Sequence, residues 1–200
     1  KNPQGLWRPG HQEHDFLSKR VYTSDKKIDL AAGLFLKAAP RLKKNTEEYN
    51  KTENSFLLII KRTVQTHNSW THNTERMIKG TQESNFAYLN PADAEKLGLQ
   101  SGDLADVYNS YGRIRIPIQT MESMMPGSVA IPHGWGHQHA KGLEVASKTK
   151  GVNVNILAGS GIEEIDDLSG MSRLTAIAVN IEAAQGPLAL SWSGIASPPQ

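Results

Sequence analysis

The sequence predicts a mainly β domain, a small closed β-barrel with one short capped helix. Several short apolar segments with the two-residue period of β-strands recur between residues 55 and 183. Within that range only residues 90–98 carry a full set of helix start and stop signals. Because repeated helices do not separate the strands, the pattern favours a closed barrel of six or seven strands over a doubly wound sheet.

The predicted helix is the most clearly marked element. Asn90 can cap it with its side-chain oxygen, and Pro91 suits the first helical position, where a missing N–H costs nothing. Asp93 can reach back to the cap as an acidic variant of the capping box, and Gly98 can end the helix in a left-handed conformation. We therefore expect a helix at about 91–97 between two strands.

The strands are predicted from their apolar patterns. Five consecutive apolar residues, Phe56 to Ile60, indicate a strand that is buried on both faces. The other strands are expected at 86–89, at 104–109 and 113–119 as a hairpin around Tyr111-Gly112, at 129–131 before Pro132, at 152–157, and at 177–181. In the strand 152–157, alternation would place Val152, Val154 and Ile156 on one face and Asn153 and Asn155 on the other.

The remaining residues flank this domain. We interpret residues 1–54 as an arm and linker, 55–183 as the barrel, and 184–200 as a tail. In the arm, Leu30, Leu34, Ala38 and Leu42 form one stripe of a short helix that Pro40 interrupts or ends. Residues 43–54 are charged and polar, which is typical of a linker.

Composition narrows the classes of function. The chain has 200 residues and no cysteine, so thiolate chemistry, disulfides and cysteine-ligated iron–sulfur clusters within it are excluded. Residues 1–54 carry a net charge of +4 and residues 55–200 a net charge of −2, so the larger part lacks the basic surface expected for nucleic acid. No run approaches the ~20 apolar residues of a membrane span. The chain starts without Met, as expected for a piece of a longer protein.

Two loops are rich in groups that bind ligands. Residues 61–73 contain two cations, two histidines and two asparagines, which suits a ligand with phosphates and many heteroatoms, or simply a solvated loop. Residues 132–139 place glycines around histidine and Trp135, which permits close approach to a planar ligand. The spacing of His133, His137 and His139 also allows a zinc site.

Two further segments are weaker candidates. The amides of Asn153 and Asn155 need partners in a strand, either a ligand edge or neighbouring backbone. Residues 166–173 combine two carboxylates, serines and Arg173; the carboxylates could accept from a purine amino group or form a solvated turn. Motifs of hydrolases, P-loops, zinc proteases and dinucleotide-binding Rossmann folds are absent from the sequence.

Taken in order, these segments resemble the C-terminal molybdopterin-dinucleotide-binding domain of the dimethyl-sulfoxide-reductase superfamily. The resemblance covers about residues 55–183 and rests on an ordered set of matches: the strand and loop ending in 67–69, Arg76, Gly80, 90–94, 97–99, 102–103, 126–127, 133–135, 155–157 and 169–170. It implies a double-psi β-barrel that closes over molybdopterin guanine dinucleotide. It also implies that other domains or subunits of a parent oxidoreductase, formate dehydrogenase-like or related, hold the molybdenum or tungsten ligand.

The resemblance also assigns candidate cofactor-binding residues. It implies that the first loop contacts the pterin and phosphates through Arg62, Gln65, His67, Asn68 and Ser69. Residues of three further segments would line the same cleft: His133, Trp135, Asn155 and Arg173. Many relatives have a Tyr-Lys pair where this chain has Leu174-Thr175, so the sequence departs from the family beside Arg173. No catalytic residue and no metal ligand is assigned to this chain.

Three functions are consistent with the residues. The first is the cofactor-binding domain, and the isolated chain is then expected to be inactive because much of the cofactor cleft lies elsewhere. The second is a non-enzymatic β-barrel that binds a protein partner. The third is a small zinc module using His133, His137 and His139.

Overall fold

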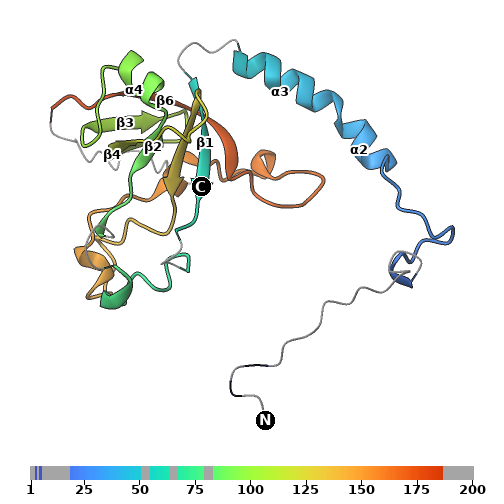
Figure 1. Cartoon of the computed structure of the whole chain (residues 1–200), viewed down its shortest axis with the longest axis horizontal. Coiled ribbons are helices and arrows are strands. Elements are labelled where there is room, and N and C mark those ends of the chain that lie inside the picture. Colours follow the sequence, from blue (N-terminus) through green and yellow to red (C-terminus); the bar gives the residue numbers. More distant parts are fainter. Residues whose placement is uncertain are drawn as a thin grey trace, which may run out of the picture. The chain divides into compact units, whose positions relative to one another are not determined.

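The structure, a computed structural model, describes residues 3, 5, 19–50, 55–63, 67–78 and 83–186 (Figure 1). The chain divides into two compact units, residues 1–44 and 45–200. None of the helices in the described ranges combines the length and the apolar character needed to cross a membrane.

Two helices occupy the region expected to be an arm and linker. Helix α2 spans Gly33–Ala38 and α3 spans Pro40–Asn50, so the predicted break at Pro40 is confirmed and Pro40 begins the second helix. Residues 43–50, which we interpret from the sequence as linker, are helical. Their lysines and glutamates have high intrinsic helix propensity, which a polar composition conceals. Residues 51–54 lie outside the described part of the chain.

Six strands form the closed barrel, which confirms the predicted fold. They are β1 (Ser55–Lys61), β2 (Ala87–Leu89), β3 (Leu104–Tyr108), β4 (Arg113–Thr120), β5 (Ser128–Pro132) and β6 (Thr175–Ala183). Their order around the barrel is β1-β5-β2-β4-β3-β6. The β1–β5 and β2–β4 pairs are parallel and the other neighbouring pairs are antiparallel, with β3–β4 as the predicted hairpin.

This topology sorts the connections between the two ends of the barrel. Strands β1, β3 and β5 run in one direction and β2, β4 and β6 in the other, as the pairings require. The connections that leave β1, β3 and β5 therefore share one end, which we call the loop end: residues 62–86, 109–112 and 133–174. The connections that leave β2 and β4 share the other, which carries helix α4 and lies uppermost in Figure 1.

The barrel interior is filled by alternating side chains. In β4, Ile114, Ile116 and Ile118 are buried, as the sequence predicts. The expectation that β1 is buried on both faces is wrong. Phe56 and Leu58 face the core, whereas Ile59 is 37% exposed. A run of apolar residues does not reveal which alternate positions face outward, because the wall of a barrel has only one core side.

Helix α4 (Pro91–Lys96) confirms most of the predicted signals and corrects one. The Asn90 side chain accepts from the Ala92 N–H at 2.9 Å, and Gly98 has φ of +66°. Asp93 does not form a capping box. It is buried, and its Oδ2 accepts from the Gly127 N–H at 2.7 Å. The carboxylate thus ties the helix to the β4–β5 turn, a contact that sequence spacing within the helix cannot reveal.

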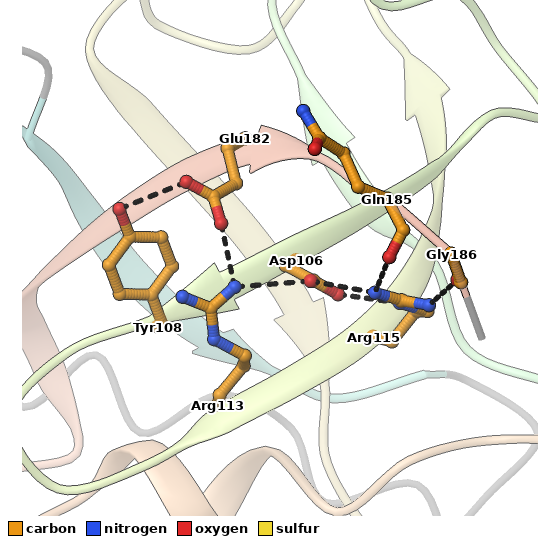
Figure 2. Close-up of polar contacts among 7 residues, drawn as sticks. All are labelled: Asp106, Tyr108, Arg113, Arg115, Glu182, Gln185 and Gly186. Atoms are coloured by element: carbon orange, nitrogen blue, oxygen red, sulfur yellow. Dashed lines mark hydrogen bonds and ion pairs between the residues drawn. The ribbon is translucent and has the colours of Figure 1, made fainter. Parts of the chain in front are cut away.

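A buried carboxylate organises the outer face of β3, β4 and β6 (Figure 2). Asp106 on β3 is only 4% exposed and forms a bidentate pair with Arg115, with Nε–Oδ1 and Nη2–Oδ2 distances of 2.7 and 2.9 Å. Arg113 lies 3.1 Å from the same carboxylate and bridges it to Glu182 on β6 at 2.7 Å. These hydrogen bonds, that from Arg115 above all, hold the pKa of Asp106 below its ordinary value. The network therefore links three strands that pair side by side.

We expect Asp106→Ala to destabilise the barrel, because it leaves the largely covered Arg115 without a counter-charge. Since the pKa of Asp106 is lowered from 3.8, the contribution of the network is present above that pH and is lost as the pH falls below it. Urea unfolding at about pH 7 and about pH 3 measures both effects. Exposed Glu122→Gln is the control, and equal stabilities for the two variants would contradict the prediction.

Candidate functional site

The first loop at the loop end is built from successive turns. The N–H of Trp70 donates to the His67 carbonyl at 3.1 Å, and that of His72 to the Ser69 carbonyl at 3.2 Å. The His67 N–H donates to Thr71 Oγ1 at 2.9 Å. Asn68 has φ of +52°, in the left-handed region that asparagine tolerates better than most residues. The turns present the polar residues 67–69 as a compact unit.

Two glycines of the second loop allow it to pack against its neighbours. Gly134 has φ of +93°, and a Cβ there would lie 2.7 Å from the Asn68 carbonyl oxygen. Gly136 has φ of +98°, and a Cβ there would lie 2.6 Å from Cβ of Asn153. The His133 N–H donates to the Lys61 carbonyl at 3.1 Å, which continues the β1–β5 pairing into the loops. The second loop therefore packs against the first loop and against residue 153. At positions 134 and 136 there is no space for a side chain larger than that of glycine.

The predicted strand at 152–157 is wrong. Residues Val154–Leu157 form the 3-10 helix η4, and the Asn153 side chain caps it by accepting from the Asn155 N–H at 3.0 Å. Asparagine competes for nearby backbone groups, so two asparagines among apolar residues favour a capped turn over a strand. Val154 and Leu157 reach the core, and Asn155 is exposed at the loop end.

Asn85 holds the loops to the barrel, and sequence reasoning missed it. Its side chain is 1% exposed and makes three hydrogen bonds. The amide donates to the carbonyls of Pro132 and Val152, both at 2.9 Å, and its oxygen accepts from the Val152 N–H at 2.9 Å. Strand β2 begins only at residue 87, so Asn85 takes the place of backbone pairing there. An asparagine beside a short apolar strand is a weak signal, because most such residues are solvated.

Other amide side chains also hold the loops of this end in place by hydrogen-bonding to their backbone groups. Asn73 Oδ1 accepts from the N–H groups of Val145 and Ala146, at 2.9 and 3.1 Å. Gln138 donates to the carbonyls of Thr149 and Gly151, and Asn109 donates to the Leu157 carbonyl at 2.8 Å. The loops are thus fixed in place although they contain little regular structure.

A buried pair of rings lies between the loops. His72 is fully buried and Trp135 is 3% exposed, with ring centroids 4.4 Å apart. His72 Nδ1 and Nε2 and Trp135 Nε1 have no hydrogen-bond partner among the described residues. Burial, with smaller effects from His137 and His133, lowers the pKa of His72 to about 4, so its ring is neutral at physiological pH. Three buried polar atoms in one place call for a polar partner.

A groove of about 740 Å³, which Trp135 helps to line, runs along β2 and β4. Arg62, Pro132 and Trp135 line its loop end, and Tyr88 and Gln119 line its wall. The Lys61 Nζ lies 4.4 Å from the centre of the Tyr88 ring. Burial and then the neighbouring cation of Arg62 lower the pKa of His133. The groove therefore has two cations, Lys61 and Arg62, at one end.

Most of the predicted site residues lie at the same end of the barrel. Seven of them lie at the loop end on the contacting loops and η4: Arg62, His67, Asn68, Ser69, His133, Trp135 and Asn155. Gln65 lies outside the described residues. Arg173 is also at the loop end but on a separate hairpin, where its N–H donates to the Glu164 carbonyl at 3.0 Å. Among the described residues, no group of three histidine or acidic side chains gathers to hold a metal ion, and His137 Nε2 instead contacts the Gly134 carbonyl.

Comparisons with known proteins agree with this geometry. Residues 56–177 match the family model described as "Molydopterin dinucleotide binding domain". A tetrathionate reductase of Salmonella typhimurium is 40% identical over 55 residues, 28% of this chain and 5% of that protein. Dimethyl sulfoxide reductase of Escherichia coli is 35% identical over 71 residues, 35% of this chain and 8% of that protein.

Two further matches cover more of the chain. The menaquinone reductase molybdopterin-binding-like subunit of Nitratidesulfovibrio vulgaris is 33% identical over 99 residues, 50% of this chain and 14% of that protein. Acetylene hydratase from Pelobacter acetylenicus superposes with a TM-score of 0.55 over 81% of this chain and 24% of that chain, at 20% identity, which supports the fold.

The chain belongs to the molybdopterin dinucleotide-binding domain family, in the dimethyl-sulfoxide-reductase superfamily. The predicted resemblance and the double-psi β-barrel are confirmed. The matched segments span only 5% to 14% of the curated relatives named above.

The residues present fit such a cofactor. Residues 61–73 and 133–152 together carry five lysines and arginines and one glutamate, which suits the negative charge of a dinucleotide. Trp135 lines the groove and contacts His72, and Gly134 and Gly136 keep the backbone free of side chains. The expectation of molybdopterin guanine dinucleotide is thereby supported by the family and by the chemistry of the site.

We expect Asn85→Ala to destabilise the barrel by about 3 kcal/mol, because it leaves buried carbonyl and N–H groups unpaired. Asn85→Asp should be as harmful near neutral pH, because a carboxylate would face the Pro132 and Val152 carbonyls. Chemical unfolding measures both effects. The control is Asn180→Ala, an amide on the outer side of β6 between the buried residues 179 and 181. If Asn85→Ala unfolds at the same urea concentration as the control, Asn85 does not stabilise the barrel by bridging residues 132 and 152.

We expect the folded chain to lose stability as the pH falls from 6.5 toward 4, partly through His72. Its pKa is lowered on folding, so its contribution is complete above 6.5 and declines as the unfolded chain takes up the proton. The decline should reach about 3 kcal/mol. His72→Phe, which keeps an aromatic ring against Trp135, should remove this part of the pH dependence. Exposed His139→Gln should retain it, and an unchanged slope for His72→Phe would contradict the assignment.

Proposed function

We propose that this chain is the cofactor-binding domain of a larger molybdenum or tungsten oxidoreductase, and that its loop end closes over molybdopterin guanine dinucleotide. The observation that carries the proposal is the convergence of seven predicted residues on two contacting loops and η4, beside a groove with cations at one end. The family match over residues 56–177 supports the cofactor class.

The residues of this chain bind and orient the cofactor in the proposal. Arg62 and Lys61 attract the phosphates, and residues 67–69, His133 and Asn155 supply hydrogen bonds to the pterin. Trp135 lines the groove, and its ring packs against the fully buried ring of His72, which keeps this part of the groove rigid. The bound group would supply the two-electron redox chemistry at its metal. The protein ligand to that metal is proposed to come from outside this chain.

The class of reaction that the parent enzyme catalyses is a separate point. The sequence suggested a formate dehydrogenase-like or related oxidoreductase. Matching relatives include proteins named as reductases of tetrathionate, arsenate and dimethyl sulfoxide. Of the two classes, we propose a reductase for the parent, with the substrate set by domains that bear the rest of the active site.

The packing of Gly134 against Asn68 gives a sharp test in the parent enzyme. Gly134→Ala would push the loops apart, because its Cβ would lie 2.7 Å from the Asn68 carbonyl oxygen. We expect this substitution to lower pterin content severalfold, measured by fluorescence after oxidation. Gly142→Ala is a matched control, because Gly142 also has positive φ, +78°, but nothing lies within 4 Å of its added Cβ.

Arg62→Ala should also lower pterin content, since a charge-assisted phosphate bond is worth about 1.5–3 kcal/mol. His139→Ala should leave it unchanged. A parent protein without pterin would favour the non-enzymatic interaction domain instead. Pterin retained in full by both Gly134→Ala and Arg62→Ala would show that the cofactor site lies elsewhere.

A further inference from the structure

Residues 159–174, which we call the acidic arm, expose an unusual amount of apolar surface. Ile162 is 84% exposed and Met171 is 66% exposed, with Leu168 and Leu174 at 39% and 43%. In Figure 1 the arm is the orange loop that projects from the barrel beside β6. Several large exposed apolar side chains on one short segment of a folded domain favour an interface there.

The shape of the arm is fixed by its own hydrogen bonds. Ile165 and Ser172 form an isolated β-bridge, and the Asp166 N–H donates to the Met171 carbonyl at 2.8 Å. The Asp166 side chain accepts from the Ser169 N–H at 2.8 Å, which closes the turn. The arm also contacts the β3–β4 turn, because the Tyr111 hydroxyl donates to Glu164. A preformed surface loses little conformational entropy when it binds a partner.

The charge of the arm is opposite to that of the loops beside the groove. It contains four carboxylates, Glu163, Glu164, Asp166 and Asp167, and one cation, Arg173. An anionic dinucleotide is repelled by this surface and attracted by the loops with residues 61–73 and 133–152. The net negative charge of the arm therefore does not favour phosphate groups, although the resemblance implies that Arg173 binds the cofactor. Its apolar and acidic side chains suit a protein surface that is apolar and basic.

We infer that the acidic arm docks onto a basic, apolar surface of another domain of the same parent polypeptide. The inference rests on the proposed function, which makes this chain one domain of a larger enzyme. Matched segments cover only 5% to 14% of the curated relatives reported above, so most of the length of such proteins lies outside the matched region. The arm then fixes how the barrel closes over the cofactor without touching the cofactor itself.

Methionine oxidation in the purified parent enzyme tests the inference. Met171 on the arm and Met125 in the β4–β5 turn are matched, at 66% and 65% exposed. With dilute hydrogen peroxide and mass spectrometry, the oxidation rate of Met171 should be at least about tenfold lower in the native parent than in the urea-unfolded parent. A native rate within about twofold of the unfolded rate would overturn the inference. Met125 reports whether protection is general or specific to the arm.

Two substitutions connect the protection to the arm and separate it from the cofactor. Ile162→Asp should raise the native oxidation rate of Met171 severalfold and leave pterin content unchanged. Leu104→Asp, at a site 51% exposed on β3, is the matched control and should change neither. Loss of pterin with Ile162→Asp would show that the arm belongs to the cofactor site, which overturns the inference. Pterin absent from the unmodified parent would instead refute the proposed function.

The same oxidation measurement shows which partner covers the acidic arm. Protection that persists on dilution, in the parent polypeptide purified without other subunits, supports docking within one chain. Protection lost on dilution would point to a second copy, and protection lost when other subunits are removed would point to a separate protein. Either loss would overturn the inference.

Discussion

The loop end of the barrel depends on amide side chains that satisfy the backbone of irregular loops. A closed barrel pairs its own strand edges, but the connections that leave β1, β3 and β5 contain few strand or helix hydrogen bonds of their own in their described residues. Buried backbone groups without partners cost free energy. Asn85, Asn73, Gln138 and Asn109 provide these partners and fix the loops relative to the core. The polar surface of the candidate site can then be held rigid without regular structure beneath it.

This arrangement explains how one small domain can carry two different surfaces. The barrel topology places the connections 62–86, 109–112 and 133–174 at the same end. Within that end, the first two loops of the site are basic and close-packed through Gly134 and Gly136, whereas the acidic arm is a separate hairpin with its own hydrogen bonds. The basic loops attract an anionic ligand, whereas the acidic arm attracts a basic protein surface.

The fully buried His72 illustrates the cost of a rigid site. A ring with two unpaired nitrogens contributes less to stability than an apolar ring of the same shape would, and burial keeps it neutral. Residues that are costly in the isolated fold are found where another component completes their contacts. The same reasoning applies to Trp135, whose indole nitrogen is also unpaired.

Local sequence was sufficient to predict the parts of the fold that local physics controls. The cap at Asn90, the left-handed Gly98, the β3–β4 hairpin and the alternation of β4 follow from propensity and period, and they are confirmed. The mainly β barrel and the family followed from the order of such segments. Tertiary structure decided what depends on partners distant in sequence. Asp93 accepts a hydrogen bond from Gly127 instead of reaching back to its own cap, and Asn85 binds the backbone of Val152. A polar side chain forms hydrogen bonds with the partners that lie nearest to it in space. The distances to partners that are remote in sequence are fixed only when the barrel closes.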